Sequence, residues 1–140
     1  MFRPLVRLPT GFSRPIDVRN ESDSHYINVE RASVRQIGGT PNTVLKGPDG
    51  YTNGVLRRPI EVKYAANNAQ GSRFRVNKDD HLEMLRKDGI YIFKLENGRS
   101  EQMGARDADR LLKYDWLNDV RPSNNQNYQH SFIMVSDVFD

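Results

Sequence analysis

The chain has no cysteine among its 140 residues, which excludes disulfide bonds, thiolate zinc sites and cysteine nucleophiles. This composition suits a reducing compartment, so we expect the protein in the cytoplasm, or in the host cytoplasm if a virus encodes it. No stretch approaches the roughly 18 uninterrupted apolar residues that a membrane-spanning helix needs. The first residues, MFRPLVRLPTGFSRP, have prolines where the apolar part of a secretory signal would lie. We therefore expect neither export nor a membrane partner.

Apolar residues are also scarce, since 36% of the chain is hydrophobic and 28% is charged, which predicts a modest core with long polar loops. The length suits one domain that buries about two-thirds of the surface of its unfolded chain. We expect a single domain over 1–140, with an arm at 1–21 and a core at 22–135. Pro4, Pro9 and Pro15 fix φ and remove amide donors, so the arm is predicted to be extended. Its arginines either contact DNA or a partner subunit, or are merely solvated.

Acidic residues are few between Ser24 and Lys78, where nine lysines and arginines accompany only Glu30, Asp49 and Glu61. Nine cations and three anions give this segment a charge of +6, and the total of +3 leaves −3 for the rest of the chain. A surface that attracts phosphates gains affinity from cations and loses it with each carboxylate. Acids kept in such a segment are candidates for holding a divalent metal, although an ordinary solvated surface is an alternative.

Hydrophobic periodicity and turn residues predict alternating helices and strands. Helices are expected over 22–37 and 78–88, and from Asp107 to near Pro122. Strands are expected over 43–46, 54–66, 74–76, 90–95, 99–103 and 131–135, with turns at 47–50 and 97–98. A sheet edge is expected at the hairpin formed by 90–95 and 99–103. This order predicts an α/β domain with a central mixed sheet of about five strands flanked by helices.

Periodicity also predicts where three of the candidate residues point. In the run Ile60-Glu61-Val62-Lys63-Tyr64, period two puts Glu61 and Lys63 on one face of the strand and the apolar residues on the other. Glu30 lies four residues after Tyr26 and seven before Ile37, beside the apolar stripe of the first helix. We expect it to face inward.

These residue types suit the hydrolysis of a phosphodiester bond, which requires an activated water, a neutralised phosphate and a stabilised leaving oxygen. Carboxylates that hold one or two Mg²⁺ ions meet this need, and a nearby lysine can orient the water. Pro48-Asp49, eleven intervening residues and then Glu61-Val62-Lys63 resemble the signature of the PD-(D/E)xK nuclease superfamily. The resemblance covers roughly residues 22–95. In size and layout it is most similar to archaeal Holliday junction resolvases and small phage or virus-encoded relatives.

This resemblance implies a restriction-endonuclease-like core and a metal-dependent endonuclease acting on DNA, with branched, Holliday junction-like DNA as one expected substrate. Asp49 and Glu61 would bind Mg²⁺ or Mn²⁺, the carbonyl of Val62 would add a ligand, and Lys63 would position the attacking water. Glu30 would be the acid of the first helix, a position that varies in the family. Five cations near the motif are expected to contact backbone phosphates, namely Arg57, Arg58, Arg73, Arg75 and Lys78.

A homodimer is expected because two cuts require two sites. The protomers would meet through the stripe of Leu111, Leu112 and Trp116 or through the strand at 90–95. No phosphate-binding loop or dinucleotide fingerprint occurs, so no nucleotide cofactor is expected. His25, His81 and His130 are too scattered for a metal site, and His81 is expected on the surface of its helix.

Each feature also has a plainer interpretation. Glu61 and Lys63 can be a solvated ion pair on a strand, and Asp49 can be part of an ordinary turn. Glu30 can pair with neighbouring arginines on a solvated helix face. The alternative functions are a noncatalytic nucleic-acid-binding module and a viral or mobile-element structural protein that uses the same basic surface.

Overall fold

The structure is a computed structural model that describes residues 5–7, 15–17, 21–44, 47–66, 72–112, 115–120 and 126–139, with side chains from Tyr26 onward. The elements in chain order are β1 (Leu5–Arg7), β2 (Pro15–Asp17), α1 (Glu21–Gln36), β3 (Thr40–Pro41), β4 (Gly50–Tyr51), β5 (Pro59–Ala65), β6 (Arg73–Asn77), α2 (Lys78–Arg86), β7 (Ile90–Leu95), β8 (Ser100–Gly104), α3 (Ala105–Asp109), β9 (Leu117–Val120), β10 (Asn127–Met134) and α4 (Val135–Val138).

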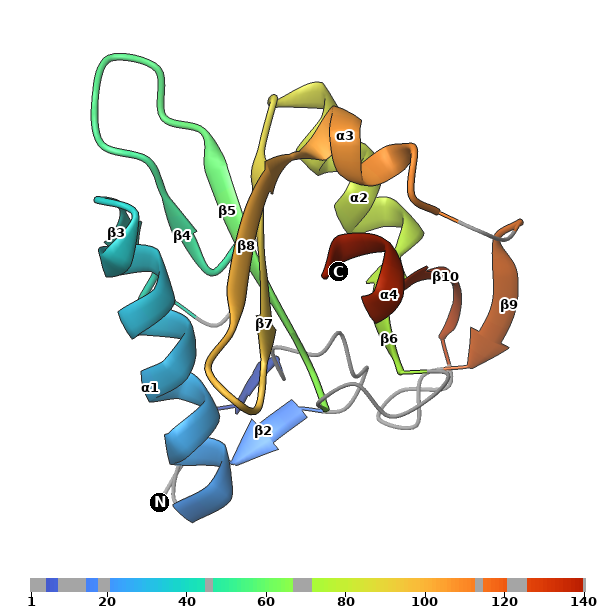
Figure 1. The fold of residues 1–140 in the computed structure, drawn as a ribbon, viewed down its shortest axis with the longest axis horizontal. Helices are drawn as coiled ribbons and strands as arrows, with labels where there is room; N and C mark the ends of the chain where they lie inside the picture. Colours follow the sequence, from blue (N-terminus) through green and yellow to red (C-terminus); the bar gives the residue numbers. More distant parts are fainter. Residues whose placement is uncertain are drawn as a thin grey trace.

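The centre of the fold is a five-stranded mixed sheet with the order β3-β4-β5-β7-β8 (Figure 1). β5 and β7 are parallel, and every other pair in this sheet is antiparallel. A parallel pair needs a crossover connection, which β6 and α2 supply. Figure 1 shows α1 on one side of the sheet and α2 on the other. The predicted α/β class, with a mixed sheet of about five strands, is confirmed.

Alternation along β5 and β7 divides the core into two clusters, one on each face of the sheet. On one face Ile60 and Val62 pack with Val34 of α1. On the other face Ala65 and Phe93 belong to a larger cluster that includes residues of α2, α3, β6 and β10. Because Glu61 and Lys63 have the same parity as Ala65, their side chains lie on the α2 side of the sheet.

A second sheet, with the order β6-β10-β9, lies beside α2 and was not predicted. The strands expected at 74–76 and 131–135 are confirmed in outline as β6 and β10, but they belong to this sheet. The helix expected from Asp107 to near Pro122 is wrong beyond Asp109, where α3 ends. Leu112 instead forms a β-bridge with Ile133, and β9 pairs with β10. These backbone pairings compete with helix formation in the segment after Asp109. Its apolar residues Leu111, Leu112 and Trp116 still pack against the core.

Three further expectations need correction. The sheet edge expected at the hairpin of 90–95 and 99–103 is β8, whereas β7, which was expected to be available for contact between protomers, lies between β5 and β8 with five of its six residues buried. The short strand found before the turn is at 40–41 and not at 43–46, of which residues 45 and 46 lie outside the described residues. The strand expected from residue 54 begins at Pro59, because residues 52–58 form a loop.

The remaining elements agree more closely with expectation. α1 and α2 lie where helices were predicted, and Asn77 caps α2 by accepting hydrogen bonds from the amides of Asp79 and Asp80. Within the predicted arm, β1 and β2 pair antiparallel, while the other arm residues lie outside the described ranges. No helix in the described ranges is both long enough and apolar enough to cross a membrane.

Candidate functional site

Asp49 directly precedes β4, and Glu61 lies in the neighbouring strand β5. Gly50 is the register partner of Ile60, so the next position places Asp49 opposite Glu61, and opposite residues in an antiparallel pair share a face. The Oδ2 atom of Asp49 accepts a hydrogen bond of 2.7 Å from the amide of Val62. The pairing between β4 and β5 ends at Gly50 and Ile60, and beyond it the Asp49 carboxylate accepts the Val62 amide in place of a backbone carbonyl. The two halves of the sequence motif are therefore joined directly.

Gly50 allows this approach between α1 and the motif hairpin. A Cβ atom at this position would lie 2.5 Å from Cγ1 of Val34 and 2.8 Å from the carbonyl oxygen of Thr40. Only a residue without a side chain fits between them, and Asp49 is its neighbour in the chain.

Glu61 and Lys63 form a buried ion pair. The Nζ atom of Lys63 lies 3.8 Å from Oε2 of Glu61, and the side chains are only 5% and 6% exposed, respectively. The predicted shared face is confirmed, and the interpretation as a solvated pair is wrong. A buried pair of charges carries a large desolvation cost, which the attraction between the partners must offset.

Glu61 also borders a pocket of about 70 Å³ between the motif hairpin and α2. The walls come from the β3–β4 connection, from β5 and from α2 with its C-cap, and the lining residues are Gly47, Pro48, Pro59, Glu61, Asp80, Glu83, Met84 and Lys87. Hydrogen bonds from Arg86 and Lys87 lower the pKa of Glu83 to about 2, so this carboxylate is ionised and held by its own helix.

The oxygen donors of the sequence motif, of which Glu61 lines the pocket, are of the kind that binds a hard divalent cation. Mg²⁺ prefers oxygen ligands and usually keeps several waters, so one or two carboxylates suffice to hold it beside a substrate phosphate. Asp49, Glu61 and the carbonyl of Val62 are donors of this kind, and the Asp49–Val62 hydrogen bond joins their two strands. Among the described side chains there is no group of three or more His, Asp or Glu arranged to hold a metal ion. A cation here would therefore complete its coordination with water or substrate.

Glu30 faces inward, as predicted, and is 8% exposed. On α1 it stands between Tyr26, whose ring contacts that of Tyr64, and Val34, which packs on Ile60 and Val62. This is the face of the sheet opposite Glu61 and Lys63. The structure brings Asp49, Glu61 and Lys63 together and places Glu30 across the sheet from them.

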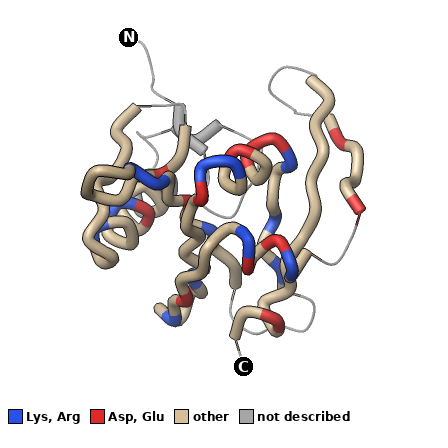
Figure 2. Tube along the Cα trace, turned by 90° about the horizontal axis from the view of Figure 1, so that it is seen from above, with Lys and Arg blue, Asp and Glu red and all other residues tan. Residues whose placement is uncertain are grey.

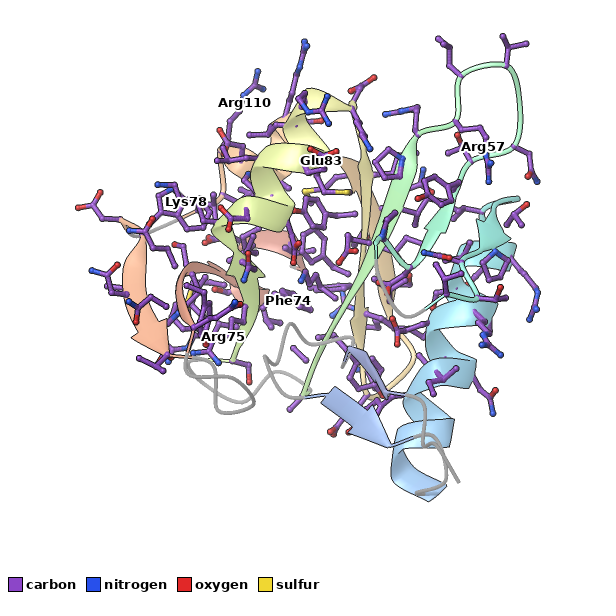
Figure 3. All side chains as sticks on the ribbon, turned by 180° about the vertical axis from the view of Figure 1, so that it is seen from behind. Arg57, Phe74, Arg75, Lys78, Glu83 and Arg110 are labelled. Carbon is purple, nitrogen blue, oxygen red and sulfur yellow. The ribbon has the colours of Figure 1, made fainter. Side chains whose placement is uncertain are left out.

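The five candidate phosphate-binding cations fall into two groups. Arg57 lies by the β4–β5 loop, whereas Lys78 and Arg75 lie on the other side of α2 (Figure 3). The Nε atom of Arg58 donates a 2.6 Å hydrogen bond to the carbonyl oxygen of Asp88 at the end of α2. Basic and acidic segments are interspersed over the described chain (Figure 2). Of these five candidates, Arg57 and Arg58 are the two that directly precede Pro59, which lines the pocket.

The second group lies at the β6-β10-β9 sheet, with Arg73 and Arg75 on β6 and Lys78 at the start of α2, and each of these cations has a local contact. Arg75 pairs with Asp119 at 3.1 Å, Lys78 donates a 3.0 Å hydrogen bond to Gln129, and the guanidinium carbon of Arg73 lies 3.7 Å from the centre of the Phe132 ring. These contacts stabilise the second sheet and leave the charges of Arg73 and Lys78 available to an anion.

His81 lies behind the motif strand, and its expected surface position is wrong because its side chain is fully buried. Nε2 lies 2.8 Å from a carboxylate oxygen of Asp109, and Nδ1 lies 2.7 Å from the hydroxyl of Tyr91. With Nε2–H donating to Asp109, Nδ1 accepts the Tyr91 O–H. Burial lowers the pKa of His81, and the charge of Lys63 lowers it further, against the opposing effect of Asp109.

The sequence contains a signal for this position. His81, Met84 and Leu85 follow the spacing of one helix face, and Met84 and Leu85 contact the larger core cluster. Tyr91 is the register partner of Glu61 in the parallel pair, so a chain of contacts runs from Asp109 through His81 to the neighbour of Glu61.

The chain matches the family model of the PD-(D/E)XK nuclease superfamily domain over residues 21–140, well beyond the segment 22–95 that carries the predicted resemblance. No curated protein and no solved structure gives a significant match. Because the family match spans most of the chain and includes both strands of the motif, the protein belongs to the PD-(D/E)XK nuclease superfamily.

Proposed function

We propose that this protein is a metal-dependent endonuclease that hydrolyses phosphodiester bonds in DNA. The observation that carries the proposal is the junction of the two motif halves, where the carboxylate of Asp49 accepts the Val62 amide beside the buried Glu61–Lys63 pair. Family membership supports nuclease chemistry and a nucleic-acid substrate.

Asp49, Glu61 and the carbonyl of Val62 would hold Mg²⁺ or Mn²⁺. One oxygen of Asp49 accepts the Val62 amide, and a carboxylate has further acceptor sites for a cation. When bound, the divalent cation supplies the positive charge that offsets the charge building up on the phosphate.

Lys63 would orient the attacking water and stabilise negative charge near it. The buried contact with Glu61 fixes the ammonium group close to the proposed ligands. Arg57 and Arg58 would contact phosphates next to the pocket, and Arg73, Arg75 and Lys78 would contact a more distant stretch of backbone. Glu30 receives no ligand role in this proposal, because the sheet lies between it and Glu61.

A homodimer acting on duplex or branched DNA extends the proposal, since each copy carries one motif and two cuts need two sites. The surfaces that the sequence predicts for the dimer contact belong to the core instead. Leu111, Leu112 and Trp116 pack against the larger cluster, and β7 is internal. Contact between protomers is therefore expected on another surface.

Incubation with plasmid and with synthetic four-way junctions, in Mg²⁺, Mn²⁺ or EDTA, tests this function. We expect cutting in the presence of either metal and none in EDTA. Glu61→Gln should abolish cutting while sparing binding, and Glu101→Gln, at an exposed position of the edge strand β8, is the matched control. A protein that shifts DNA but leaves it intact under every condition is the noncatalytic module. Cutting that survives in Glu61→Gln comes from a contaminant.

A further inference from the structure

The loop between β4 and β5, residues 52–58, extends past the end of the central sheet (Figure 1). Its tip carries two adjacent aliphatic side chains in full contact with solvent, because Val55 is 101% exposed and Leu56 is 82% exposed. Single exposed apolar residues are ordinary on protein surfaces. Two adjacent exposed apolar side chains at the end of a projecting loop form a small apolar surface, which is a candidate interaction site.

Hydrogen bonds fix the base of this loop. The amide of Thr52 donates to the carbonyl of Arg58 at 2.9 Å, and the amide of Arg58 donates to the Thr52 hydroxyl at 2.9 Å. The side-chain amide of Asn53 donates to the carbonyl of Gly38 after α1, and Arg58 donates to the carbonyl of Asp88 after α2. The tip is thus presented from a base tied to both helices, which reduces the ordering cost of binding.

Charge and position indicate the partner. Arg57 follows Leu56 directly, and its guanidinium carbon lies 4.7 Å from the centre of the Tyr51 ring. Pro59 lines the same pocket as Glu61. Leu56 is five residues before Glu61, so the two lie at most about 16 Å apart, the length of that segment if fully extended. An apolar tip, an adjacent cation and the candidate site therefore follow one another along one segment.

We propose that Val55 and Leu56 form an apolar wedge that enters duplex DNA at a base step beside the site of cutting. This inference rests on the proposed function, because it takes DNA as the substrate. Aliphatic side chains that enter a base step cover the unstacked base faces and kink the duplex. Arg57, next to the wedge, would hold the backbone phosphate at the kink. The DNA would then be bent at a fixed distance from Glu61.

The test measures binding to DNA duplexes that carry the fluorescent base 2-aminopurine at successive positions, so that unstacking at each base step can be detected. EDTA is present so that no DNA is cut. We expect fluorescence to rise at one or two steps with the unaltered protein and not with Val55→Ala/Leu56→Ala. Affinity should fall about tenfold, while the dependence of affinity on salt stays the same because no phosphate contact is lost. Leu117→Ala/Val120→Ala is the matched control, since these residues are 46% and 48% exposed on β9.

The outcomes separate this inference from the proposed function. If the tip variant binds and unstacks the duplex as the unaltered protein does, the wedge is refuted and the nuclease proposal stands. If unstacking depends on the tip but no metal supports cutting, the nuclease proposal fails alone. A protein that binds no duplex refutes the wedge, and it refutes the nuclease proposal as well if the four-way junctions and the plasmid are also left uncut. Sedimentation that shows a dimer lost only in the tip variant, with fluorescence unchanged, assigns the tip to contact between copies and overturns the wedge.

Discussion

Removing the carboxylate of Glu61 should destabilise the fold through its effect on Lys63. The Lys63 side chain is 5% exposed, and its Nζ atom lies 3.8 Å from Glu61. Loss of one partner from a buried ion pair costs about 3–5 kcal/mol because the other charge stays buried. The separation is long for such a pair, so we expect the lower end, about 3 kcal/mol. That is a large part of the roughly 5–15 kcal/mol that stabilises a typical domain.

Urea unfolding followed by circular dichroism measures this effect in Glu61→Gln, Lys63→Met and the double variant. Each single change should cost about 3 kcal/mol, and the double variant should lose less than the sum by about 1 kcal/mol or more. Glu83→Gln is the control, because Glu83 pairs with Arg86 and Lys87 on an exposed surface. Its midpoint should barely move. The reasoning is refuted if the two single effects simply add, or if both are as small as that of the control.

Three other expectations follow from named contacts. Millimolar Mg²⁺ or Mn²⁺ should raise the melting temperature by about 4 °C if the dissociation constant is about tenfold lower than the metal concentration, and a rise of equal size in Glu61→Gln would argue against metal binding here. Burial lowers the pKa values of His81 and His130, so the unfolded chain binds more protons below about pH 6.5. Unfolding free energy should therefore fall as the pH drops from 7 to 5, and less steeply in His130→Gln; equal slopes in urea titrations would contradict this. Gly50→Ala should cost roughly 2 kcal/mol through overlap with Val34, and an unchanged thermal transition would show that α1 yields readily.

The central sheet could be predicted because the local signals agree with the tertiary fold. Period two along β5 assigns Glu61 and Lys63 to one face, and the cores on both sides of the sheet require that alternation. The second sheet is a tertiary effect. Helical spacing at Leu111, Leu112 and Trp116 indicates a helix, but pairing of this region with β10 provides backbone hydrogen bonds that spacing does not reveal. No local pattern states which strands will be partners.

The candidate site was predictable in its sequence positions and less so in its surroundings. The motif gives Asp49, Glu61 and Lys63, but it does not show that α2 packs on the same side of β5 as Glu61. His81 shows the same limit, since its position on the inward face of α2 follows from spacing, whereas its partner Asp109 comes from α3. Glu30 was correctly predicted to face inward, but the helix periodicity carries no information about which face of the sheet α1 covers.

Asp49 unites the two interpretations that the sequence left open, the structural turn and the metal ligand. Its Oδ2 atom joins β4 to β5 through the Val62 amide, and the same carboxylate is the proposed source of charge for the cation. Asp49→Asn keeps an oxygen acceptor for that amide and removes the charge, whereas Asp49→Ala removes both. The free energy of unfolding in urea should therefore be close to that of the unaltered protein in Asp49→Asn and about 1–2 kcal/mol lower in Asp49→Ala. Both variants should lose cutting. Full cutting by Asp49→Asn would leave Asp49 with the structural role alone.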